Sequence, residues 1–179
     1  NVAIGHQSLD ALTGGTRNVA IGAYSMDIGS GGTENVAIGR YTGRNLTGSN
    51  NTLLGAYAGE SATAVSHLIA IGRYTGQAVD RSGNSYSVLM GGANSLTDVY
   101  ASVVIGHFAY NGSVNGGQRN AIIGFEAAQN STGIDYTAVL GAEALKAATT
   151  SGADGTVAIG YQASYSLTSG ANQVSIGYQ

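Results

Sequence analysis

The 179-residue chain carries few charges: Asp, Glu, Lys and Arg make up 9% of it, and the formal net charge is −3. Its seven basic residues are scattered, whereas a nucleic-acid surface needs clustered cations. No stretch has the length and apolar character of a membrane span. We therefore expect neither nucleic acid as a partner nor membrane insertion. With no cysteine and no proline, the fold must be held by packing and hydrogen bonds.

A short repeat runs through the whole chain. The segment Asn-Val-Ala-Ile-Gly opens the sequence and returns at residues 18–22 and 35–39, and degenerate copies follow to the end. Each copy ends in a glycine, and successive glycines lie 15 to 19 residues apart, with a mean period close to 17. These structural repeat anchors are Gly5, Gly22, Gly39, Gly55, Gly72, Gly91, Gly106, Gly124, Gly141, Gly160 and Gly177. Such regularity defines about eleven copies of one unit and a single repeat domain over residues 1–179, which we interpret as a fragment of a longer fibre.

Each repeat has the pattern of a short strand. Val and Ile alternate around a third apolar or small residue, and the glycine that follows marks a tight bend or a close backbone approach. Gly, Ser, Asn and Thr clusters supply the turns, and a period near 17 leaves room for two short strands in each coil. Residues 141–149 contain helix formers, but they stay in register and are treated as another copy. The sequence therefore predicts an all-β fold, a stacked parallel β-roll or β-solenoid. The recurrent asparagines before the strands predict a ladder of side-chain amides (Asn1, Asn18, Asn35 and Asn51).

The strands are apolar on both faces, which predicts an oligomer. The Val and Ile positions face one way, the position between them faces the other, and no strand position carries a charge. A strand with two apolar faces is buried on both. One face fills the interior of the coil, and the other, which we assign to the alanine-rich middle positions, packs against neighbouring chains. A homotrimer, intertwined or side by side, is the expected assembly.

The Asn-Val-Ala-Ile-Gly copies and the terminal segment 171–177 resemble the head repeats of YadA-like trimeric autotransporter adhesins. The 17-residue spacing and the Gly-Tyr-Gln sequences at residues 160–162 and 177–179 more closely resemble repeats of phage tail fibres. The resemblance implies a trimeric extracellular fibre on a virion or bacterial surface that mediates attachment to a host or cell surface. The adhesin repeat is typically shorter than 17 residues, so the coil geometry of this chain departs from that family.

An aromatic file is the main candidate for ligand contact. The position two residues after the anchor holds, in the N-terminal half and beyond, Tyr24, Tyr41, Tyr57, Tyr74 and Phe108. Stacked rungs would bring these rings together, either as a platform for sugar rings of a surface glycan or as a purely structural ladder. Two near-identical copies add a cation beside the ring, at Arg40–Tyr41 and at Arg73–Tyr74. A second candidate is the loop with Asp80 and Arg81, where the repeat spacing lengthens and a receptor protein or glycan could be bound.

Other chemistry is weaker in the sequence. Glu126 and Glu143 share the file position in consecutive rungs, and two adjacent carboxylates would suit a glycosidase, but two surface acids are the simpler interpretation. His6, His67 and His107 lack metal-ligand spacing. We expect no enzyme activity, no catalytic residue, no metal and no cofactor. The alternatives to attachment are a purely structural shaft and a polysaccharide-degrading enzyme on a β-solenoid. An ice-binding face is disfavoured because no Thr-x-Thr occurs.

Overall fold

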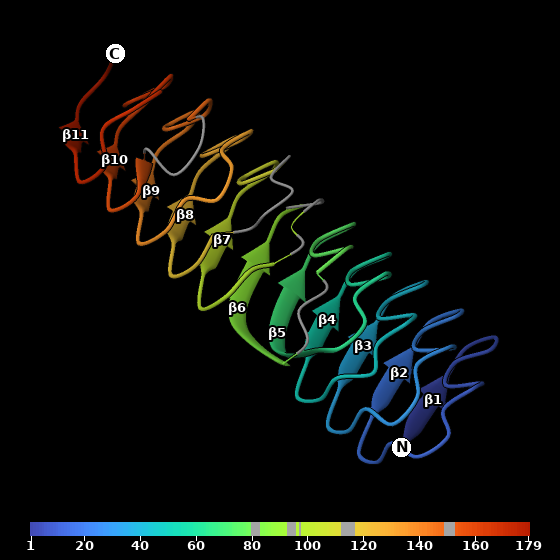
Figure 1. Cartoon of the computed structure of the whole chain (residues 1–179). Coiled ribbons are helices and arrows are strands. Elements are labelled where there is room, and N and C mark those ends of the chain that lie inside the picture. Colours follow the sequence, from blue (N-terminus) through green and yellow to red (C-terminus); the bar gives the residue numbers. More distant parts are fainter. Residues whose placement is uncertain (80–82, 93–95, 97, 112–116, 149–152) are drawn as a thin grey trace.

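The computed structural model describes residues 1–79, 83–92, 96, 98–111, 117–148 and 153–179, and it is an all-β solenoid (Figure 1). Within these described residues, eleven strands form one sheet in which each strand pairs, parallel, with its neighbours in sequence. The strands are β1 Val2–Ile4, β2 Val19–Ile21, β3 Val36–Ile38, β4 Thr52–Leu54, β5 Val65–Ile71, β6 Gly83–Met90, β7 Val103–Ile105, β8 Ala121–Ile123, β9 Ala138–Leu140, β10 Val157–Ile159 and β11 Val174–Ile176. The chain advances by one coil per strand, so its two ends lie at opposite ends of the stack (Figure 1).

The register of the sheet confirms the repeat. Val2 pairs with Val19, which pairs with Val36, and the same alignment of equivalent positions holds from each strand to the next up to Val157 and Val174. Equivalent residues in neighbouring coils are therefore about 4.8 Å apart along the stack. Side chains that share a repeat position form continuous files on the surface or in the interior.

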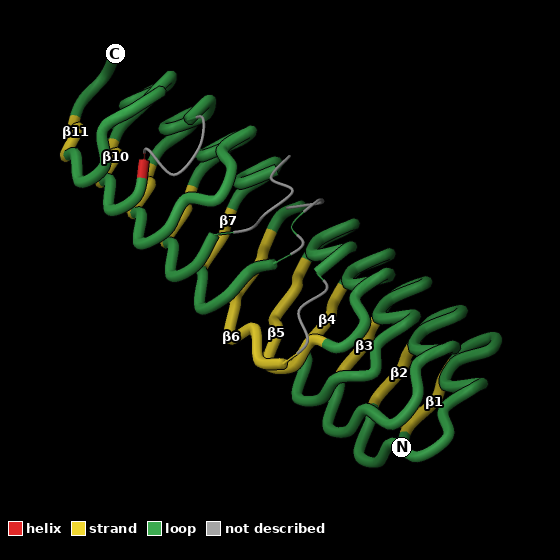
Figure 2. Tube along the Cα trace, viewed as in Figure 1, coloured by secondary structure: helices red, strands yellow, loops and turns green. Residues whose placement is uncertain are grey.

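Most of each coil is turn rather than strand (Figure 2). The expectation of two strands in each coil is wrong, because within the described residues each repeat contributes one strand to the sheet. Left-handed residues tighten the remainder of the coil, for example Tyr24 (φ 59°), Met26 (φ 50°) and Arg17 (φ 60°). The turns still bond from coil to coil: the N–H of Tyr24 donates to the carbonyl of His6, and the N–H of Met26 donates to that of Thr42. The backbone is thus paired along the stack even where it is not extended.

Strands β5 and β6 are longer than the others. They pair from Val65 and Gly83 onward, with a register shift between Ser66 and Leu68. Gly83 and Asn84, which follow the loop predicted around Asp80 and Arg81, begin β6. Asp80 and Arg81, proposed from the sequence as ligand contacts, lie outside the described residues.

The potential helix at residues 141–149 is a copy of the repeat, as expected. Residues 142–147 form turns, and Glu143 and Leu145 have φ values of 56° and 52°, which no right-handed helix allows. Residue 149 lies outside the described residues.

The interior of the coil is filled by the middle residue of the strands and by turn residues. From β2 to β10 each middle position is buried: Ala20, Ala37, Leu53, Ala70, Leu89, Val104, Ile122, Val139 and Ala158. Met26, Leu46 and Leu145 reach the same core from the turns. The assignment of the alanine-rich positions to a chain–chain interface is therefore wrong. The coil is narrow, so small middle residues leave room for the longer side chains that enter from the opposite side.

The anchoring glycines sit where backbones of neighbouring coils approach closely. Gly22 has a φ of +130°, and a Cβ on it would lie 2.5 Å from the carbonyl oxygen of Gly39. Gly124 has a φ of +144°, and a Cβ there would lie 2.3 Å from the carbonyl oxygen of Gly141. Both the backbone conformation and the available space thus require glycine, which confirms the interpretation of the repeat anchor.

The predicted asparagine ladder is present. The Oδ1 atom of Asn35 accepts hydrogen bonds from the backbone N–H and the side-chain amide of Asn51, both at 2.9 Å. Its own Nδ2 donates to the carbonyl of Gly48 at 3.0 Å. Asn18 and Asn120 likewise donate from Nδ2 to a turn carbonyl and accept a backbone N–H of the next coil at Oδ1. At the same position in two further coils, the hydroxyls of Ser87 and Ser102 accept the backbone N–H of the following coil. The ladder satisfies buried backbone groups at the start of the strands.

Candidate functional site

The outward residues of the strands form a continuous apolar surface, here called the outward face. It consists of the first and third positions of each paired triplet, which are Val, Ile, Leu, Met or Ala with the single exception of Thr52. None of these side chains is buried. Val103, Ile123 and Leu140, on strands β7, β8 and β9 in the middle of the stack, are 38%, 40% and 50% exposed. Ten steps between eleven strands make this face roughly 48 Å long. Apolar surface of this extent marks an interaction site.

The first aromatic file follows the C-terminal ends of the strands, as the sequence predicted. The rings of Tyr24 and Tyr41 stack with centroids 4.8 Å apart and planes 6° apart. Tyr57 continues the stack at 5.4 Å from Tyr41, and Tyr74 lies 4.8 Å from Tyr57. The rings therefore pack on one another, which is the structural interpretation of the file, and each is only partly buried.

Arg40 and Arg73 behave differently despite their near-identical surroundings in sequence. The Arg40 guanidinium lies over Tyr41 and Tyr57, 5.2 and 5.0 Å from their centroids, and donates a hydrogen bond to the Tyr57 hydroxyl in the next coil. The Arg73 guanidinium lies 4.4 Å from the centroid of Tyr74 and donates to the hydroxyl of that same residue at 2.9 Å. The coil that follows Arg73 has no tyrosine at the file position, since residue 93 is an alanine in the sequence.

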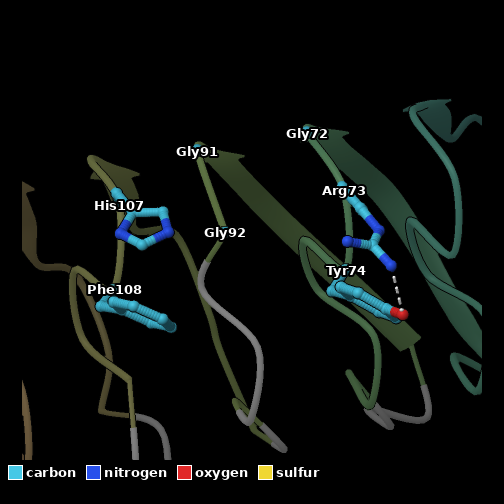
Figure 3. Close-up of a pocket in the computed structure, with 7 residues that line it drawn as sticks. All are labelled: Gly72, Arg73, Tyr74, Gly91, Gly92, His107 and Phe108. Atoms are coloured by element: carbon cyan, nitrogen blue, oxygen red, sulfur yellow. Dashed lines mark hydrogen bonds between the residues drawn. The ribbon is translucent and has the colours of Figure 1, made fainter.

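A hollow of about 380 Å³ lies where the first file is interrupted. Figure 3 shows the ring of Tyr74 on one side, the ring of Phe108 on the other, and the Gly91–Gly92 backbone between them without side chains. Arg73 bends back over Tyr74, and His107 lies beside Phe108 at a centroid distance of 3.9 Å. The hollow is thus bounded by two aromatic rings, each accompanied by a basic side chain. Of the residues proposed from the sequence, Arg73 and Tyr74 line it, whereas Arg40 and Tyr41 do not.

A second aromatic file precedes the strands and was missed by the sequence analysis. His67 stacks on Tyr86 at 4.8 Å, and Tyr86 meets Tyr100 edge-on at 6.3 Å. The guanidinium of Arg119 lies 5.3 Å from the ring centroids of both Tyr100 and Tyr136 and donates to the Tyr136 hydroxyl at 2.8 Å. The signal was available, because most of these residues lie two positions before a strand triplet. The two files flank the outward face at the two ends of its strands.

The paired glutamates are engaged by a lysine. Lys146 Nζ lies 2.5 Å from Glu126 Oε2 and 3.8 Å from Glu143 Oε1, and Gln162 donates to the other oxygen of Glu143 at 2.7 Å. The hydrogen bond to Glu126, together with the charges of both carboxylates, raises the pKa of Lys146 above its usual value. The three charged side chains are largely covered rather than freely solvated. This file position carries an ion-pair cluster in the C-terminal half in place of stacked rings.

The histidines contact the aromatic files or, for His67, belong to one. His6 meets Tyr24 edge-on at 5.3 Å, and His107 lies near Phe108 and Phe125. Within the described residues, no group of three His, Asp or Glu side chains is placed to hold a metal ion. Among the same residues there is no helix with the length and apolar character needed to span a bilayer.

Comparisons of the chain with protein-family models, with curated proteins and with solved structures found no match. Function has to be inferred from the surfaces of the chain itself. Those surfaces are the outward face, the two aromatic files and the hollow in the first file.

Proposed function

We propose that this chain is a segment of a homotrimeric extracellular fibre, a phage tail fibre or a bacterial surface adhesin, that attaches to a host or cell surface. The outward face carries the proposal. A stack of short strands with an uninterrupted apolar side suits side-by-side packing of identical chains, because the same face on each copy runs the full length of the stack.

The energetics of the outward face favour its coverage. Burying a fully exposed Val, Leu or Ile side chain contributes about 1.5–3 kcal/mol, so covering one that is about half exposed contributes roughly 1 kcal/mol. Leu140 and Ile123 are such residues, and equivalent side chains recur on every strand. The occupant we propose is a second and a third copy of the chain, since a partner with the same rung spacing can match this face along its whole length.

Attachment is supported by the flanking files. Aromatic rings with arginines beside them provide apolar surfaces and hydrogen-bond donors at the edges of the outward face, where they would remain accessible in an assembly. The resemblance of the repeats to adhesin heads and tail fibres points the same way. A purely structural shaft would have the same outward face but no ligand for the files.

Binding of the labelled chain to intact bacterial cells and to immobilised cell-surface polysaccharides tests the attachment function. We expect saturable binding to a subset of these surfaces. Binding should weaken at least tenfold for Ile123→Lys, which places a charge in the proposed interface and thereby removes multivalency. Ser30→Lys adds the same charge at an exposed turn away from the outward face and should bind as the unmodified chain does. An assembled chain that binds none of these surfaces would overturn attachment in favour of a shaft.

A further inference from the structure

We propose that neighbouring copies of the chain meet along the two edges of the outward face, coil by coil and in register, with Arg40 of one copy facing Glu34 of the next and Phe125 facing Arg119. The inference depends on the proposed homotrimer and adds the residue pairs that join its copies. It is carried by a reciprocal pattern of size and charge between residues that lie too far apart to contact each other within one chain.

One row of residues borders the outward face at each end of its strands. The leading rim holds the residue two positions before each paired triplet, and the trailing rim holds the residue directly after each anchoring glycine. From β2 to β11 the leading rim consists of Arg17, Glu34, Asn50, His67, Tyr86, Ala101, Arg119, Tyr136, Gly155 and Asn172. The trailing rim consists of Ala23, Arg40, Ala56, Arg73, Gly92, His107, Phe125, Ala142, Tyr161 and Tyr178. Apart from Gly92, every member is exposed or half-buried, so a neighbouring copy can reach both rims.

The two rims can meet between copies but not within one. In the coil of β8, Arg119 and Phe125 are six residues apart with the strand between them, a separation of up to about 20 Å. Around an axis parallel to the stack, with the outward faces turned toward that axis, the strands of one copy begin where those of its neighbour end. The trailing rim of each copy then faces the leading rim of the next, and rotation about the axis keeps equal coils at equal heights.

The rims are reciprocal in size. In most coils a large residue on one rim faces alanine or glycine on the other, and in no coil are both residues small. These pairs are Arg17 with Ala23, Asn50 with Ala56, Tyr86 with Gly92, Ala101 with His107, Tyr136 with Ala142, and Gly155 with Tyr161. Closely packed surfaces need such alternation, because two large side chains hold the copies apart and two small ones leave a void. Tyr136 and Tyr161, 62% and 41% exposed in a single chain, each gain a small neighbour to pack on.

Two of the other coils pair complementary chemistry. In the coil of β3, Arg40 faces Glu34, so a cation meets a carboxylate and both side chains are exposed. In the coil of β8, the half-exposed ring of Phe125 faces the guanidinium of Arg119, and a cation is attracted to an aromatic ring. The coils of β5 and β11 pair two large residues and follow neither rule.

The register follows from the same residues. A shift by one coil in one direction would bring Arg40 opposite Arg17, which places two like charges together. A shift in the other direction would bring Ala142 opposite Gly155 and leave a void, whereas the in-register alignment gives each of them a tyrosine. Equal coils therefore face each other.

Contacts within the chain hold the charged side chains at the rims. Glu34 accepts a hydrogen bond from Arg17 at Oε1, at 2.8 Å, and its other carboxylate oxygen can accept from Arg40 of a neighbouring copy. Arg40 lies over the neutral rings of Tyr41 and Tyr57, which do not neutralise its charge. The rims meet on their inner sides and leave the outer sides of both aromatic files accessible. A surface ligand at this junction would contact residues of two copies.

Chemical crosslinking of the assembled chain tests the pairing, since the chain has no cysteine of its own. The double variant Arg119→Cys with Phe125→Cys, treated with a short bis-maleimide, should give covalent trimers on a denaturing gel, because every junction brings the two thiols together. The matched control Arg119→Cys with Arg73→Cys displaces one partner by three coils, about 14 Å, and should give at least about tenfold less covalent trimer.

Charge reversal tests the pair of Arg40 and Glu34 independently. Arg40→Glu and Glu34→Arg should each raise the concentration at which the assembly dissociates by about tenfold or more, because like charges replace an attractive pair at every junction. The combined variant restores opposite charges across the junction and should recover most of this loss. Contacts within the chain predict the reverse, since the combined variant loses those of both residues.

Two results would overturn the pairing. One is a three-chain mass in solution with no more covalent trimer from Arg119→Cys with Phe125→Cys than from the control. The other is a combined charge variant that dissociates as readily as the weaker single variant. In either case the homotrimer and its attachment function survive and only the residue pairs are lost, whereas a single-chain mass would remove both. Circular dichroism of each variant verifies that the coil has not unfolded.

Discussion

Replacing an anchoring glycine by alanine should destabilise the stack far more than replacing a glycine elsewhere in the same coil. At Gly124 the new Cβ would lie 2.3 Å from the carbonyl oxygen of Gly141, on a residue whose φ is +144°. At Gly133, nine positions later, φ is +59° and a Cβ would meet nothing within 4 Å. At Gly14 a Cβ would also meet nothing within 4 Å, and the backbone is not left-handed.

These three sites separate backbone strain from steric overlap. Gly133→Ala carries only the left-handed penalty, about 1–2 kcal/mol. Gly124→Ala adds displacement of the neighbouring backbone to its own strained conformation, and each contributes about 1–3 kcal/mol, so we expect a loss of roughly 3–5 kcal/mol. Gly14→Ala should change the free energy of unfolding by less than about 0.5 kcal/mol.

Urea unfolding followed by circular dichroism, at one fixed chain concentration, measures these differences. The expected order of stability is Gly14→Ala, then Gly133→Ala, then Gly124→Ala, with the last separated from the second by about 1–4 kcal/mol. Equal losses for Gly124→Ala and Gly133→Ala would refute the close approach of neighbouring coils at the anchor. Backbone conformation alone would then explain the recurrence of glycine.

Three further predictions concern the interior, the ladder and the ion-pair cluster. Leu53→Ala should lower the free energy of unfolding, measured in urea, by about 2–5 kcal/mol because Leu53 is fully buried. Leu54→Ala on the outward face should lower it less and should weaken chain association instead. Equal losses for the two variants would contradict the assigned orientation of β4. Asn35→Ala should cost about 2–4 kcal/mol in the same assay because it leaves two backbone groups, the carbonyl of Gly48 and the N–H of Asn51, without their side-chain partner. A neutral result would show that the amide ladder is dispensable. The ion pairs of protonated Lys146, which raise its pKa, stabilise the fold below pH 10.5, and this contribution is lost as the pH rises through the folded-state pKa. The difference in urea midpoint between the unmodified chain and Lys146→Met should therefore shrink at alkaline pH. A constant difference would contradict the ion-pair assignment.

The repeat and its register could be predicted from the sequence because glycine spacing reports backbone geometry directly. The φ values and close contacts at Gly22 and Gly124 are those that only glycine accepts, so each anchor marks the same point of a coil. The asparagine ladder was predictable for the same reason, since equal spacing places Asn18, Asn35 and Asn51 in adjacent coils.

The direction of the strand faces was not predictable from alternation alone. Alternation shows that Val36 and Ile38 lie opposite Ala37, but it does not say which side is inside the coil. The interior also receives Met26 and Leu46 from the turns, and these fill the space that an inward Val or Ile would need. The turn residues therefore decide the orientation, and their positions depend on left-handed corners that side-chain patterning does not reveal.

The interruption of the first file was visible in the sequence, but the hollow was not. An alanine two residues after Gly91 shows that one ring is absent from the file. Whether neighbouring side chains fill the space depends on their conformations, and Arg73 bends back to Tyr74 rather than across the gap. The second file was not predicted because its positions precede the strands, where no glycine marks them, and hold His, Tyr and Arg in place of one residue type.

The solution mass of the chain, measured by light scattering on the size-exclusion peak, tests the homotrimer. We expect a mass near three times the 17.9 kDa of one chain, and a shift toward a single chain for Ile123→Lys but not for Ser30→Lys. A stable particle of 17.9 kDa for the unmodified chain would contradict it, because the outward face would then remain uncovered in a folded, soluble monomer.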